Sequence, residues 1–154
     1  MGALTILRRC RGAKEEMERI QRRVARRRDA MTSITQAPSE GGGGGSDDRY
    51  ASFVSAIDEY ESLLKRRDAC YRAELSASCA LLEELPETES AVLYDYYVQV
   101  EKVDAIARKM RYSESYVRRV KACGEQRVRG IDESRVRAAL PDWYLLQERE
   151  AAGA

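Results

Sequence analysis

Hydroxyl, phenol and cationic side chains gather between residues 113 and 121, and this group is the part of the chain best suited to bind another molecule. Its members are Ser113, Ser115, Tyr116, Arg118, Arg119 and Lys121. Guanidinium and ammonium groups bind phosphate oxygens, and arginine also forms paired hydrogen bonds with guanine. Hydroxyl groups add hydrogen bonds to phosphates and base edges. These residue types predict contacts with double-stranded DNA.

Most kinds of catalytic and metal site are excluded by composition. The 154 residues include no histidine, which removes the commonest general base and the commonest transition-metal ligand. The acidic pairs, such as Glu15 and Glu16, are adjacent in sequence and therefore do not face one another on a helix. The five glycines at 41–45 are not followed by Lys-Ser or Lys-Thr, so they form no phosphate-binding loop. We predict no enzymatic activity, no catalytic residue, no cofactor and no metal.

The elements that position the basic group are two short helices with a turn between them. The spacing predicts a helix over Val103–Met110, a turn at Arg111 and Tyr112, and a second helix over 114–127 with Ser113 as its N-cap. Small Ala107 lets the second helix cross the first. The apolar residues expected to join the two helices are Val103, Ile106, Met110, Val117 and Val120. This helix-turn-helix spacing would let the second helix enter a major groove.

Together with Leu85-Pro86-Glu87 and Leu93-Tyr94-Asp95-Tyr96-Tyr97, this segment resembles region four of bacterial sigma factors. It is most similar to small phage-encoded transcriptional regulators that carry such a domain behind a helical hairpin. The residues that match the family pattern are Ile106, Ala107, Tyr112, Ser113, Glu114 and Val117. The resemblance implies activation of late or packaging genes. The family usually has glycine where this chain has Arg111, which we therefore expect in a left-handed conformation.

The first 37 residues predict a basic, coiled-coil-like helix. Ten arginine and lysine residues stand against four acidic ones in this stretch. Apolar residues recur at alternating steps of three and four from Ala3 to Ile34, and only Arg27 interrupts them. The arginines in this half of the helix are expected to pair with an acidic partner helix or, alternatively, with phosphates; they are Arg19, Arg22, Arg23, Arg26, Arg27 and Arg28.

Residues 38–48 predict a flexible glycine-rich loop, and residues 49–85 predict a second, acidic helix that begins at a cap at Asp47 or Asp48. A basic helix, a glycine loop and an acidic helix of similar length indicate an antiparallel hairpin. Pro86 should end the second helix and start the next. Residues 86–130 would form the helix-turn-helix domain. The extension at 131–154 predicts a short helix and an apolar segment around Trp143, which packs on the domain or docks on a partner such as RNA polymerase.

The sequence as a whole predicts an all-α chain with a long helical hairpin followed by a compact helix-turn-helix domain. No run of about 18 apolar residues is present, so no membrane span is expected. The four cysteines contain no CxxC pair and are expected to stay reduced, which favours the cytoplasm of a bacterial host cell.

The predicted function is a DNA-binding transcriptional regulator of the phage late-gene activator type. Double-stranded DNA is its expected partner, and host RNA polymerase or a second copy of the chain is the candidate partner of the hairpin. Two alternatives stay open: a phage small terminase subunit, and a coiled-coil interaction protein that does not bind DNA.

Overall fold

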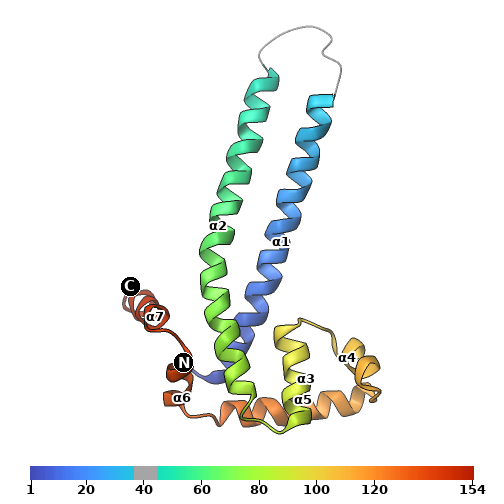
Figure 1. Ribbon diagram of the computed structural model, residues 1–154, viewed down its shortest axis with the longest axis vertical. Coiled ribbons are helices and arrows are strands. Elements are labelled where there is room, and N and C mark those ends of the chain that lie inside the picture. The colour runs from blue at the N-terminus through green and yellow to red at the C-terminus, as the bar shows by residue number, and fades with distance from the viewer. Residues whose placement is uncertain (37–44) are drawn as a thin grey trace. The chain divides into compact units, whose positions relative to one another are not determined.

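The computed structural model describes residues 1–36 and 45–154, and every regular element within these ranges is helical (Figure 1). The predicted all-α class is therefore confirmed. None of the helices described combines the length and apolar character needed to cross a bilayer. Two compact units are formed, one from residues 1–15 and 69–154 and the other from residues 16–68. The elements are α1 (Ala3–Gln36), α2 (Gly45–Leu82), α3 (Glu87–Leu93), the π-helical turn η1 (Tyr94–Val98), α4 (Val103–Met110), α5 (Glu114–Arg129), α6 (Glu133–Ala139) and α7 (Asp142–Gly153).

Within the unit of residues 16–68, α1 and α2 pack side by side along the seam that the heptad pattern predicts. Its core is made of Ile20, Val24 and Ile57. Glu16 pairs with Arg67 at 3.3 Å and Arg28 pairs with Glu61, so the two helices run antiparallel here. The arginine that interrupts the seam, Arg27, is accommodated because its guanidinium lies over the rings of Phe53 and Tyr60, 5.9 and 5.8 Å from their centres.

The other unit is built around a core to which the first turns of α1, the last turns of α2, and α3, η1, α5, α6 and α7 contribute. Every residue of this core is less than 10% exposed. Its principal members are Leu4, Ile6, Leu7, Cys10, Ala77, Leu81, Leu82, Leu93, Val98, Val128, Val136, Leu140 and Tyr144. Because the end of α2 shares this core with α3, the boundary expected at residue 85 does not separate two compact units.

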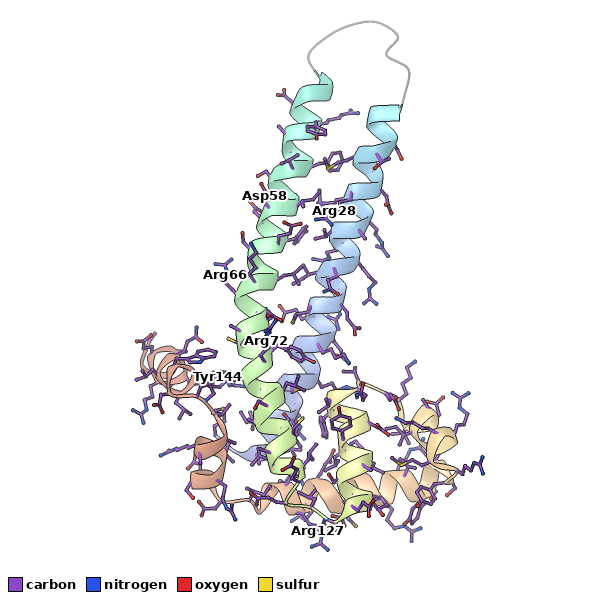
Figure 2. The ribbon with its side chains drawn as sticks, viewed as in Figure 1. Arg28, Asp58, Arg66, Arg72, Arg127 and Tyr144 are labelled. Carbon is purple, nitrogen blue, oxygen red and sulfur yellow. The ribbon has the colours of Figure 1, made fainter. Side chains whose placement is uncertain are left out.

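A buried polar network attaches α7 to this core. The Tyr144 hydroxyl donates to Oε1 of Glu74 at 2.8 Å, and Arg9 donates to the same hydroxyl at 3.1 Å. Figure 2 labels Tyr144 between α7 and α2. Arg9 also pairs with Glu148 at 2.7 Å. Burial is the main reason that the pKa of Tyr144 rises to about 12. The neighbouring Trp143 stays 44% exposed, so of the two aromatic residues in the expected apolar segment only Tyr144 packs on the domain.

The helix bounds differ from the expected ones at the ends of α2. The helix begins at Gly45, ahead of the expected cap, which places Asp48 in the first turn where the helix dipole favours a carboxylate. It ends at Leu82, after which Leu85 N–H bonds to the Leu82 carbonyl in a turn before Pro86. Proline disfavours helical backbone in the residue before it, so the early ending has a local cause. Of the glycine-rich loop expected at 38–48, residues 45–48 instead belong to α2, and residues 38–44 lie outside the described residues.

Candidate nucleic-acid interface

The turn between α4 and α5 is closed by a residue in the left-handed conformation, as expected. Arg111 has φ 58° and ψ 40°. Its N–H bonds to the Arg108 carbonyl at 3.3 Å, and the N–H of Tyr112 bonds to the Ala107 carbonyl at 2.9 Å. These two bonds make the Schellman ending of α4, in which glycine is the usual left-handed residue. An arginine in that position carries a conformational cost of about 1–2 kcal/mol.

The start of α5 is fixed by Ser113, the first of the predicted site residues. Its hydroxyl accepts a hydrogen bond from the N–H of Tyr116 at 3.2 Å. Such a cap satisfies one of the free donors of the first turn and is typically worth about 1 kcal/mol. The Ser113 side chain is exposed but already used by the backbone. Its role in this structure is therefore to orient the helix on which the other candidates lie.

The inner face of α5 is packed on α3 and α4 through a small apolar core. Met110 and Tyr116 pack on the edge of this core. Its members are one residue of α3, two of α4 and two of α5, namely Val92, Ile106, Ala107, Val117 and Val120. Ile106, Val117 and Val120 are among the residues predicted to join the two helices, and Ala107 is the small residue expected where they cross. The inner face is therefore fixed, and the opposite face of α5 is left for other contacts.

The opposite face of α5 carries Ser115, Arg118 and Arg119, all exposed. Tyr116 lies at its border, half-buried, with its ring 4.8 Å from the ring of Tyr112 and 5.6 Å from the Arg119 guanidinium. We define the α5 surface as Arg111, Tyr112, Ser115, Tyr116, Arg118 and Arg119. Tyr112 is 44% exposed, and neither it nor Arg111 belongs to the predicted site. Both residues lie directly before the N-cap of α5, and this position could have identified them as site residues from the sequence.

The cations of the α5 surface differ in how they are neutralised. Arg118 pairs with Glu114 one turn earlier, at 3.0 Å, and both side chains are exposed. Among the described residues, Arg119 has no acidic partner and only the Tyr116 ring beside it, and Arg111 has no acidic partner either. The surface therefore offers two unpaired guanidinium groups and a third in an exposed pair, which contributes little stability and exchanges readily.

Lys121, the last predicted site residue, does not lie on the α5 surface. At 100° per residue it is roughly 120° around the helix from Ser115. Its Nζ lies 2.6 Å from Oε1 of Glu125 and 4.4 Å from the centre of the Tyr96 ring, and its side chain is 21% exposed. The structure therefore brings together Ser115, Tyr116, Arg118 and Arg119 but places Lys121 in a separate, partly enclosed cluster.

The Lys121 cluster has its own electrostatics. Burial acts to raise the pKa of Glu125, but the hydrogen bonds from Lys121 and Tyr97 and the nearby positive charges outweigh it and lower that pKa overall. The Tyr97 hydroxyl donates to Glu125 Oε1 at 2.5 Å, and burial together with this carboxylate raises the pKa of Tyr97. Because the lysine charge is compensated by a carboxylate held in its ionised form, little of it is available to an external anion.

A second cationic surface lies on α1, in the unit of residues 16–68. The exposed side chains of Arg19, Arg22, Arg23 and Arg26 follow the spacing that places them on one helix face. None of the four has an acidic partner among the described residues. Of the arginines expected to pair with the acidic helix, Arg28 does so with Glu61.

No group of three or more potential metal ligands is found in the part of the chain that the structure describes. In comparisons with protein-family models, with curated proteins and with solved structures, nothing matches this chain.

Proposed function

We propose that this chain is a DNA-binding transcriptional regulator in which α5 enters the major groove. The observation that carries the proposal is the α5 surface itself: a left-handed turn and a serine cap hold a helix whose inner face is buried and whose outer face bears Ser115, Arg118 and Arg119. A major groove admits an α-helix, and arginine is the side chain that most often reads guanine there.

The roles within the surface follow from position and charge. Arg118 and Arg119 reach base edges or the phosphates that border the groove, and Arg118 exchanges its exposed pairing with Glu114 for a DNA acceptor. Arg111 and Tyr112, at the N-terminal end of α5, meet the backbone beside the groove. Helix N-termini favour anions, which supports a phosphate contact at this end.

The four arginines on the face of α1, Arg19, Arg22, Arg23 and Arg26, fit a sequence-independent contact with phosphates. Exposed guanidinium groups without acidic partners release counterions from DNA when they bind, which adds affinity and salt dependence but no discrimination between sequences. Both surfaces thus add affinity for DNA, whereas discrimination between DNA sequences comes from α5.

The wider biological role rests on the resemblance of residues 85–128 to sigma factor region four. The proposed role is activation of phage late genes in the cytoplasm of a bacterial host cell. Host RNA polymerase is the proposed protein partner, and the exposed Trp143 is the residue of the C-terminal extension best suited to meet it.

The test is to sequence genomic fragments retained by the purified chain and then measure fluorescence anisotropy on the best fragment over a salt series. Replacing Arg118 and Arg119 with alanine should weaken binding by roughly 10- to 100-fold for each base that these arginines read. The matched control replaces Arg137 and Arg149, exposed on α6 and α7, which removes the same charge elsewhere. Equal affinity and equal salt slope in the two double variants would contradict the proposal, as would failure to retain any DNA at low salt.

A further inference from the structure

One side of α2 in the unit of residues 16–68 is open along several turns. A hollow of about 890 Å³ follows it, and the apolar side chains of Tyr50 and Leu63 beside it are 45% and 38% exposed. Small side chains, Ala51, Ser55 and Ser62, recur along the middle of this side, and larger ones such as Val54 and Asp58 lie beside them. Because the distance between packed helices depends on the side chains at their contact, such a face accepts another helix at short range.

Four charged residues flank Ser62 in a regular pattern. Asp58, Glu59, Lys65 and Arg66 are all exposed, and none has an ion-pair partner among the residues that the structure describes. Figure 2 shows Asp58 and Arg66 on the side of α2 turned away from α1. Residues seven apart lie on the same flank of a helix face. Glu59 and Arg66 therefore share one flank of Ser62, and Asp58 and Lys65 share the other.

This pattern is complementary to itself when a second α2 runs in the opposite direction. With Ser62 facing Ser62 across a two-fold axis, Arg66 of each copy comes level with Glu59 of the other, on the same flank. Lys65 likewise comes level with Asp58 of the other copy. We infer that two copies of this chain associate through this face of α2, antiparallel and centred on Ser62. Such a contact is closed and uses the same patch twice, as in most two-fold dimers.

The charges also argue against other occupants of the face. In a parallel, in-register pair, the flank with Glu59 and Arg66 would meet the flank with Asp58 and Lys65, so acid would face acid and base would face base. The arginine face of α1 from another copy would pair with Asp58 and Glu59 but meet Lys65 and Arg66 with like charge, whereas the antiparallel α2 pair matches all four residues. Complementary charges mainly select partner and orientation, whereas the small residues, Tyr50 and Leu63 supply the contact area.

The experiment is sedimentation velocity over a wide concentration range, with the 17.5 kDa chain expected to approach twice its mass. Two reversal variants, K65E/R66E and D58K/E59K, each place like charges on both flanks and should raise the dimer dissociation constant at least tenfold. Mixed in equal amounts, the two variants regain all four ion pairs and should form a heterodimer of wild-type affinity. The matched control, R22E/R23E, makes the same charge change on α1 and should leave the dimer intact.

Three outcomes would overturn the inference: a wild-type chain that stays monomeric throughout, reversal variants that dimerise as the wild type does, or a mixture that dimerises no better than its components. All four substituted side chains are exposed, so each variant should keep the helical circular dichroism of the wild type. The inference does not depend on DNA binding, and its outcome leaves the proposed function untouched.

Discussion

The Arg119 guanidinium lies 5.6 Å from the centre of the Tyr116 ring, one turn apart on α5, and has no acidic partner among the described residues. Lys121, two positions later, has its charge compensated by Glu125 at 2.6 Å. The two cations are close in sequence but differ in their availability to an anion, and that difference can be measured.

The first prediction compares Arg119→Ala with Lys121→Ala. If Arg119 contacts a phosphate, its removal should lower the slope of log affinity against log salt by about 1, whereas removal of Lys121 should leave the slope unchanged. Fluorescence anisotropy on one DNA fragment at several salt concentrations measures both. Equal slopes in the two variants would show that Arg119 is no more available than Lys121.

The second prediction concerns the left-handed turn. Arg111→Gly should leave stability unchanged or raise it by up to about 1 kcal/mol, since glycine relieves the strain at φ 58° but loses more entropy on folding. Arg108→Gly, inside α4, should instead cost about 1 kcal/mol. Urea midpoints at unchanged slope give both values. A clear drop in stability in Arg111→Gly would mean that the turn is not left-handed in solution.

The third prediction uses two glycines within helices. A Cβ at Gly124 would lie 2.9 Å from Cδ1 and 3.2 Å from Cγ of Leu93, which is fully buried, whereas a Cβ at Gly12 would meet nothing within 4 Å. Gly12→Ala should therefore stabilise the fold by up to about 1 kcal/mol through helix propensity. Gly124→Ala should destabilise it, because overpacking typically costs about 1–3 kcal/mol. Thermal melts that shift in the same direction for both variants would rule out the close approach of α3 and α5.

The fourth prediction concerns alkaline pH. Burial raises the pKa of the Cys10 thiol from 9.0 to about 11. As the pH rises, the thiol loses its proton in the unfolded chain before it does so in the folded chain. The stability that Cys10 contributes is therefore fully present below pH 9 and is lost as the pH rises from 9 to about 11. Cys10→Ala should flatten the fall in the free energy of unfolding across this range. A pH series of urea midpoints checks the slope, and an unchanged slope would contradict the burial of Cys10.

The local features of the candidate site could be predicted from sequence because each depends on a few neighbouring residues. The left-handed Arg111 follows from the sharp turn that the spacing requires, and the Ser113 cap follows from its place before a helical run. The shared apolar cluster of Ile106, Ala107 and Val117 follows from the helical spacing on either side of that turn. These interactions act within one or two turns, where residue type and spacing decide the outcome.

The features that sequence could not predict depend on residues far apart in the chain. Glu74 is a charged residue of α2, yet it is 1% exposed and accepts a hydrogen bond from Tyr144, seventy positions away. Because lysine is a basic residue, Lys121 is predicted to lie on the outer face of α5. Its four-residue spacing to Glu125 is typical of a helical ion pair and could have indicated that its charge is compensated. Its contact with Tyr96 comes from another element and does not follow from that spacing.

The division of the chain between its two units has a consequence for the order of folding during synthesis. Residues 16–68 form a contiguous stretch whose contacts close a simple hairpin, so this unit can form soon after it leaves the ribosome. The first turns of α1 must wait, because Arg9 finds its hydrogen-bond partner Tyr144 only 135 residues later. Until then Leu4, Ile6 and Leu7 have no complete core to enter. The first turns of α1, although they precede residues 16–68 in the sequence, are thus among the last parts of the unit of residues 1–15 and 69–154 to reach their place.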